Sequence, residues 1–140
     1  MANSEKDVYK EVKKIVRSRL KGRCLKISDR HIAGIVDLYT CDNAFGPTWI
    51  EVKYETNPKM AKTKIKLKMT ALQRNFIREE QACGGKAGWL LCVKVKPRLW
   101  RYYAGSDASV TEVSQRSFIQ ERKAGEALNI IRVLETIHNV

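Results

Sequence analysis

The sequence predicts a single α/β domain in which a central mixed sheet is flanked by helices. Apolar residues recur at helical spacing near both ends of the 140-residue chain, segments of alternating polarity lie between them, and residues 88–95 are almost all apolar. These patterns are typical of amphipathic helices, half-buried strands and a strand buried on both faces, respectively. We expect one domain over 1–140 with the element order αβββαββα, a core over about 4–104 and a helical C-terminal extension over about 114–140.

The chain begins with the pattern of a helix followed by a short strand. Ser4 is a typical N-cap residue. The apolar positions that follow it at helical spacing are Val8, Val12, Ile15, Val16 and Leu20. They predict an amphipathic helix over 4–20, which the Lys21-Gly22 step ends. Residues 23–28 alternate in polarity and predict a short strand.

The next two strands are predicted to form a hairpin. Residues 34–39 and 48–54 are rich in β-branched and aromatic residues, and turn-forming residues lie between them at 43–47. The following segment, 55–68, contains five lysines and Pro58. We therefore expect a mobile basic loop after the hairpin.

The second half of the chain predicts a helix, two strands and a closing helix. Thr70-Ala71-Leu72-Gln73 matches a capping box, and Gly84-Gly85 is expected to end the helix that it begins. The apolar run 88–95 and residues 99–104 predict the two strands. Residues 127–138 carry the apolar stripe of the closing helix.

Composition restricts the partners and the location. Lysine plus arginine number 27 against 15 acidic residues, so the formal net charge is +12, which favours nucleic acid as partner. The basic residues do not gather on one amphipathic helix, so no membrane partner is expected. The four cysteines form no CxxC pair and the two histidines are far apart, which disfavours a structural zinc site. Without a signal peptide or a long apolar run, we expect a cytoplasmic protein of a bacterium or a virus-infected host cell, not a secreted one.

Three residues of the predicted hairpin are the candidates for catalysis. Side chains alternate along a strand, so Glu51 and Lys53 point to one face while their apolar neighbours point to the core. Pairing of the two strands can bring Asp37 beside Glu51. Two carboxylates facing one gap repel each other, and a hard divalent cation such as Mg²⁺ or Mn²⁺ stabilises them. With an ammonium alongside, this group fits phosphodiester hydrolysis.

These residues resemble the PD-(D/E)xK nuclease superfamily. The motif matches Ile35-Val36-Asp37 and Glu51-Val52-Lys53, with valine at the second position where the family usually has proline. Within the superfamily, the nearer likeness is to the virus-type replication-repair nuclease (VRR-NUC) branch. Residues 67–73, and Gly84-Gly85 before an apolar strand, resemble segments of that branch and occur in the same order along the chain. The resemblance covers roughly residues 4–95.

The resemblance implies a restriction-endonuclease-like core and a metal-dependent nuclease. Asp37, Glu51 and the main-chain carbonyl of Val52 would hold Mg²⁺ or Mn²⁺. Lys53 would serve the attacking water, and Gln73 would lie at the edge of the site as a further catalytic residue. The alternative for Gln73 is structural, because the fourth position of a capping box bonds back to the first.

Nucleases of this kind often add a glutamate from the first helix, and the sequence offers Glu5 and Glu11. At about 100° per residue, Glu5 falls roughly 30° from the centre of the apolar stripe and Glu11 roughly 90° from it. Glu5 is therefore the candidate for an additional metal ligand. The alternative is that Glu5 only interacts with the positive end of the helix dipole.

Basic residues around the predicted loop are candidates for contacts with the nucleic-acid backbone. The set is Lys59, Lys62, Lys64, Lys66, Lys68 and Arg74, with Arg78 nearby. Phosphate contacts of this kind position a nucleic acid without reading its sequence. The alternative is a charged, solvated loop.

The sequence as a whole favours a divalent-metal-dependent endonuclease acting on DNA. The resemblance adds a preference for branched substrates such as flaps or four-way junctions. Acting on a junction requires a symmetric dimer, and the apolar closing helix is a candidate interface for a homodimer. The alternatives are a basic binding module that has kept the fold without cleaving, a restriction-type endonuclease, and a metal-independent RNA nuclease.

Overall fold

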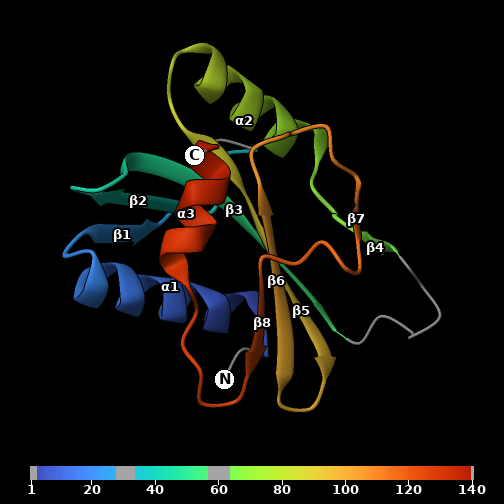
Figure 1. The fold of residues 1–140 in the computed structure, drawn as a ribbon. Coiled ribbons are helices and arrows are strands. Elements are labelled where there is room, and N and C mark those ends of the chain that lie inside the picture. Colours follow the sequence, from blue (N-terminus) through green and yellow to red (C-terminus); the bar gives the residue numbers. More distant parts are fainter. Residues whose placement is uncertain (1–2, 28–33, 57–63, 140) are drawn as a thin grey trace.

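The computed structural model describes residues 3–27, 34–56 and 64–139, and its centre is a six-stranded sheet (Figure 1). In chain order the elements are α1 (Glu5–Arg19), β1 (Arg23–Lys26), β2 (Leu38–Asp42), β3 (Gly46–Thr56), β4 (Lys64–Lys66), α2 (Ala71–Ala82), β5 (Ala87–Lys96), β6 (Leu99–Gly105), β7 (Glu112–Ser114), β8 (Gln120–Lys123) and α3 (Ile130–His138). The strand order is β1-β2-β3-β5-β6-β8, while β4 and β7 form a separate two-stranded sheet. Only the β3–β5 pair in the six-stranded sheet of the described chain is parallel, so the sheet is mixed, as the sequence predicts.

Two apolar cores cover the two faces of the sheet. On one face, α1 and α3 pack against β2, β3, β5 and β6. On the other face, α2, β4 and β7 pack against β5 and β6. Side chains of β5 alternate between the cores, with Leu90 and Cys92 in the first and Leu91 and Val93 in the second. This double burial explains why β5 is apolar at almost every position.

The first two helices begin where the sequence predicts, and the third begins later. The Ser4 side chain accepts a hydrogen bond from the Asp7 N–H at 3.3 Å and caps α1. Thr70 and Gln73 form a complete capping box at the start of α2. The closing helix α3 starts at Ile130 rather than at 127, because Asn129 provides its N-cap. No helix in the described part of the chain has the length and apolar character to cross a bilayer.

Three short strands were not predicted. The strand β4 has the sequence Lys-Ile-Lys, β7 has Glu-Val-Ser and β8 has Gln-Glu-Arg-Lys, so none contains a run of apolar residues. The prediction of a helical extension after residue 114 therefore missed β8, which forms an edge of the central sheet. Pairing with β6 and burial of Arg122 hold β8 in place.

Two boundaries of the hairpin differ from the prediction. The strand β2 begins at Leu38 rather than at 34, so Asp37 lies just before it. The predicted basic loop over 55–68 is wrong at both ends, because β3 continues to Thr56 and residues 64–66 form β4. The middle of that predicted loop, 57–63, lies outside the described residues.

Candidate active site

The strand β3 places Glu51 and Lys53 on the face of the sheet that α2 covers. Ile50 and Val52 belong to the core beneath α1 and α3, so the side chains that alternate with them point the other way. Glu51 is buried, with its side chain 1% exposed, and its Oε2 lies 3.3 Å from Nζ of Lys53. A carboxylate this deeply buried needs charged or hydrogen-bonding partners, because its desolvation is costly.

The hairpin brings Asp37 opposite Glu51. The β2–β3 register pairs Leu38 with Ile50, and one step further along it Asp37 faces Glu51. The Ile27 N–H donates to the Asp37 carbonyl at 2.7 Å, which continues the β1–β2 pairing to this residue. The two carboxyl groups lie within hydrogen-bonding reach of each other. The structure therefore brings together the two acids that the sequence predicts as partners.

The environment of Glu51 favours its protonated form. Burial is the largest cause, and the hydrogen bond to Asp37 and its negative charge act in the same direction. Lys53 opposes them, and the net effect raises the pKa of Glu51 from 4.5 to about 8. The Oε1 atom of Glu51 is buried without a hydrogen-bond partner among the described residues. A bound cation is one partner that would satisfy this atom.

The α2 helix supplies a fixed partner for Glu51. The Gln73 Oε1 accepts from the Thr70 N–H at 2.9 Å, and the Thr70 side chain accepts from the Gln73 N–H at 3.1 Å. The free end of the same amide, Nε2, donates to Oε2 of Glu51 at 3.0 Å. The two interpretations of Gln73 are thus compatible, because one side chain caps the helix and contacts the buried carboxyl.

The donor set can be tested against a divalent cation. Across residues 3–27, 34–56 and 64–139, no three His, Cys, Asp or Glu side chains lie close enough together to hold a metal ion. Asp37 and Glu51 form a pair of carboxyl groups, and Oε1 of Glu51 has no hydrogen-bond partner among the described residues. Mg²⁺ is commonly held by one or two carboxylates, with water and substrate phosphate completing its octahedron. The pair fits that mode of binding and not a cage made entirely of protein ligands.

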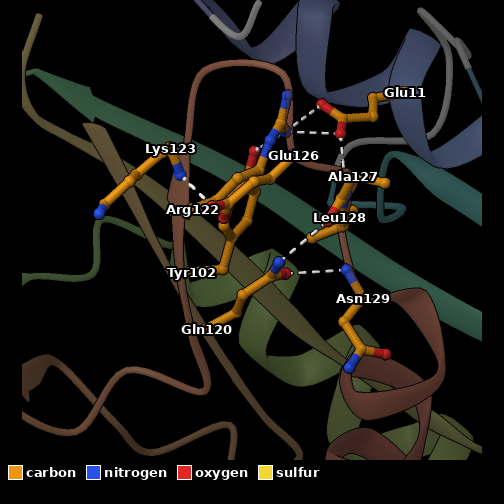
Figure 2. A network of polar contacts seen from close by, with 9 residues as sticks. All are labelled: Glu11, Tyr102, Gln120, Arg122, Lys123, Glu126, Ala127, Leu128 and Asn129. Atoms are coloured by element: carbon orange, nitrogen blue, oxygen red, sulfur yellow. Dashed lines mark hydrogen bonds and ion pairs between the residues drawn. The ribbon is translucent and has the colours of Figure 1, made fainter. Parts of the chain in front are cut away.

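The first helix directs Glu5 toward this site and Glu11 away from it. Burial raises the pKa of the Glu5 carboxyl, while Lys53 lowers it and Asp37 raises it, which places Glu5 within the electrostatic reach of both. Glu11 instead forms an ion pair with Arg122, and its Oε1 accepts from the Leu128 N–H at 3.2 Å (Figure 2). Glu5 is therefore on the side of α1 that lies within electrostatic reach of Asp37 and Lys53, as its angle on the helix predicts, but in the described residues it does not form a three-ligand cluster with Asp37 and Glu51.

Tyr9 is a residue near the site that the sequence analysis missed. Its hydroxyl hydrogen-bonds with Asp37, and burial together with the negative charge of Asp37 raises the pKa of this hydroxyl. A protonated hydroxyl donates to the carboxylate and orients it. The sequence could have indicated Tyr9 through its spacing, because it lies one helical turn after Glu5 on the same face of α1.

The predicted backbone-binding residues have different surroundings. Lys59 and Lys62 lie outside the described residues. Lys64, Lys66 and Lys68 are exposed on and after β4, and Lys64 and Lys68 lie 3.9 Å and 3.4 Å from the carboxylates of Glu112 and Glu55. Exposed pairs of this kind are weak and leave the lysines available to a polyanion.

Arg74 has a structural role that the prediction of a phosphate contact did not anticipate. Its Nη1 donates to the carbonyls of Ala108 and Val110 at 2.7 and 2.6 Å, and its Nη2 to the carbonyl of Leu67 at 3.1 Å. These hydrogen bonds connect α2 to Leu67, just after β4, and to residues 108–110, just before β7. The nearby Arg78 is exposed and donates to Asn75 on the same helix at 3.4 Å.

Comparison with known proteins identifies the fold. No family model matches the sequence, and no curated protein matches it. A solved structure with a similar fold is Hjc, a Holliday junction resolvase from the archaeal hyperthermophile Archaeoglobus fulgidus. The TM-score is 0.52 at 13% sequence identity, and the match covers 86% of this chain and 91% of that chain. The chain therefore has the restriction-endonuclease-like α/β fold that the sequence predicts, with a central mixed sheet flanked by helices.

Proposed function

We propose that this chain is a divalent-metal-dependent endonuclease that hydrolyses phosphodiester bonds in branched DNA, four-way junctions in particular. The observation that carries the proposal is the environment of Glu51. Its carboxyl is fully buried, lies beside that of Asp37, has an ammonium at 3.3 Å and retains one oxygen without a partner. If Glu51 and Lys53 formed only a structural ion pair, neither the neighbouring Asp37 carboxyl nor an unpaired Glu51 oxygen would be required.

Each residue of the site has a distinct role in this proposal. Asp37 and Glu51, with the main-chain carbonyl of Val52, would hold Mg²⁺ or Mn²⁺, and Glu5 is an additional ligand candidate. When bound, the ion supplies positive charge that polarises the phosphodiester and favours ionisation of water. Lys53 orients the attacking water and neutralises charge that develops on the phosphate.

Two neighbours position the acids in this scheme. Gln73 fixes the orientation of the Glu51 carboxyl through Oε2. Tyr9 fixes Asp37 through its hydroxyl. Because both neighbours are themselves anchored, Gln73 by its capping box and Tyr9 by burial in α1, the two acids are held before substrate arrives.

Charge and fold together support the choice of substrate. The net charge of +12 favours a polyanion. The fold is shared with a protein described as a Holliday junction resolvase. Cutting both strands of a four-way junction symmetrically requires two active sites, so the proposal includes a homodimer. Membership of the VRR-NUC branch is part of the same proposal and would agree with a preference for flaps or junctions.

The deciding experiment measures cleavage of labelled linear, flap, four-way junction and RNA substrates with Mg²⁺, with Mn²⁺ and with EDTA. We expect metal-dependent cutting of the junction, and binding without cutting by Asp37→Asn. The matched control is Asp107→Asn, which alters an exposed aspartate whose carboxylate accepts from Ser109. Equal cleavage by wild type and Asp37→Asn would reject the site. Binding without cleavage by wild type in every metal would identify a binding module.

A further inference from the structure

A pocket of about 210 Å³ lies between α1 and β1, at the edge of the central sheet. It is lined by Lys6, Tyr9, Lys10, Lys13, Cys24, Lys26 and Leu38. The floor is apolar and buried, since Tyr9, Cys24 and Leu38 are 8%, 1% and 1% exposed. The rim consists of the four lysines, all of them exposed, and the lining contains no acidic residue.

The four lysines converge because of the geometry of α1 and β1. Lys6, Lys10 and Lys13 are spaced i, i+4 and i+7, which places them on one face of α1. Lys26 comes from β1, and its ammonium lies 4.8 Å from the centroid of the Tyr9 ring. Within the part of the chain that the structure describes, none of the four forms an ion pair with a carboxylate. No ion pair of the described residues offsets their mutual repulsion, so the cluster favours binding of a polyanion.

The pocket is continuous with the carboxylate pair through one residue. The ring of Tyr9 lines the pocket, and its hydroxyl hydrogen-bonds with Asp37. Lys26 also acts electrostatically on Glu5, as does Asp37 of the same pair. Phosphates recur roughly every 3.4 Å of helix rise along a DNA strand. A strand whose scissile phosphate lies at Asp37 and Glu51 thus reaches the pocket within a few nucleotides.

We propose that the Lys6–Lys10–Lys13–Lys26 pocket binds the phosphodiester backbone of the DNA strand on one side of the bond that is cut. The identification of the ligand as DNA rests on the proposed function. The pocket presents four flexible ammonium groups around an apolar floor, which suits phosphate oxygens, and phosphate contacts position a strand without reading its sequence. The pocket lies on the side of the sheet that α1 covers, whereas Lys64, Lys66 and Lys68 lie on and after β4, which packs on the opposite face. The pocket would therefore direct the strand along α1.

Lysine footprinting tests the proposal on the wild-type protein. The exposed lysines are acetylated in EDTA, with and without a four-way junction DNA, and the modified positions are read by mass spectrometry. We expect at least a several-fold protection of the four rim lysines in the complex. Lys96 on the interior strand β5 and Lys123 on β8, the edge strand opposite β1, are both exposed and should be modified at unchanged rates. Unchanged modification of the rim lysines, or no complex, overturns the proposal.

A pair of double variants provides a second test. Lys10→Ala/Lys13→Ala removes two ammonium groups from the rim, and Lys96→Ala/Lys123→Ala removes the same charge elsewhere. The dissociation constant for junction DNA is measured against salt concentration in EDTA. The slope of log Kd against log salt should fall by about 1.8 for the rim variant, from about 0.9 per lost phosphate contact, and by much less for the control. Equal effects of the two variants overturn the proposal.

The two proposals fail separately. If wild type cuts DNA but the rim variant keeps the wild-type slope, the pocket assignment is wrong and the nuclease assignment stands. If the slope falls as expected but wild type cuts in no metal, the pocket assignment stands and the nuclease assignment is wrong.

Discussion

The Nε2 of Gln73 donates to Oε2 of Glu51 at 3.0 Å, so the N-terminus of α2 is joined to the most deeply buried acid of β3. The other end of the same amide closes the capping box with Thr70. Helix capping and orientation of Glu51 therefore depend on one side chain. The two roles can be separated experimentally because Thr70 takes part only in the cap.

Gln73→Ala and Thr70→Ala should both destabilise the protein, but only Gln73→Ala should affect cleavage. Each removes part of the capping box, which should lower the free energy of unfolding by about 1 kcal/mol, and Gln73→Ala should cost more because it also removes a hydrogen bond to the buried Glu51 carboxyl. Only Gln73→Ala also releases Glu51, so only this variant should slow single-turnover cleavage, by tenfold or more. Urea denaturation and single-turnover kinetics at saturating enzyme measure the two effects. Equal cleavage rates for the two variants would show that Gln73 only caps α2.

Removal of the ionisable group at position 51 should change how stability depends on pH. The pKa of Glu51 rises from 4.5 to about 8 in the folded chain, so between these values the folded state holds a proton that the unfolded state has released. Its contribution to the free energy of unfolding is therefore complete below pH 4.5 and decreases as pH rises to about 8, by up to about 1.4 kcal/mol per pH unit.

Glu51→Gln cannot ionise and should lose that dependence. In EDTA, the variant should gain stability relative to wild type as pH rises from 5 to 8, as measured by denaturation at several pH values. Other titrating groups, such as His138, whose pKa is lowered by burial, are present in both proteins. Their contributions therefore cancel when the unfolding free energy of one protein is subtracted from that of the other. Parallel pH profiles would contradict the assigned burial of the charge.

Divalent cations should stabilise wild type but not variants of the carboxylate pair. A ligand that binds only the folded state raises the free energy of unfolding by about 2.7 kcal/mol at one hundred times its Kd. We expect Mg²⁺ and Mn²⁺ to raise the Tm of wild type and of Asp107→Asn, and to leave the Tm of Asp37→Asn nearly unchanged. Thermal unfolding over a metal titration measures this. An equal rise in Asp37→Asn would place the cation elsewhere.

Tyr9→Phe should impair cleavage without loss of folding. The variant keeps the buried ring and removes the hydroxyl that orients Asp37. We expect a several-fold fall in kcat, with little change in the Kd for DNA measured in EDTA. Tyr103→Phe is the matched control, because its hydroxyl donates to the Gln115 carbonyl at 2.8 Å and does not contact the carboxylate pair. Each substitution should cost about 1 kcal/mol of stability. A similar kcat for both variants would rule out a positioning role for Tyr9.

Glu5 and Glu11 should behave as opposites. Glu11→Ala leaves Arg122, which is 5% exposed, without its carboxylate partner, and should cost about 3 kcal/mol of unfolding free energy. The cleavage rate per folded molecule should change little. Glu5→Ala should reduce cleavage and scarcely alter stability. Chemical denaturation and cleavage assays of the two variants separate these outcomes, and a stable, inactive Glu11→Ala protein would reverse the assignment.

Patterns of polarity were sufficient to predict most of the fold. The apolar run of β5, the capped helices and the hairpin around 43–47 all follow local rules that a sequence displays directly. The strand β8 could not be predicted in this way, because its residues are all polar and it exists only through pairing with β6. The same reason explains β4 and β7, which are three residues each and stabilise one another.

Some features of the candidate site could likewise be predicted from the sequence, and others could not. Alternation along β3 determined that Glu51 and Lys53 share a face, and the helical angle of Glu5 determined that it turns toward the sheet. The predicted hairpin also indicated that Asp37 could lie beside Glu51, and the register agrees with that prediction. Only the tertiary structure decided that Tyr9 contacts Asp37, that Arg74 donates to main-chain carbonyls and that Glu11 pairs with Arg122. The physical reason is that periodicity fixes the direction of a side chain relative to its own helix or strand. Contacts between elements depend on register and packing, which are properties of the whole fold.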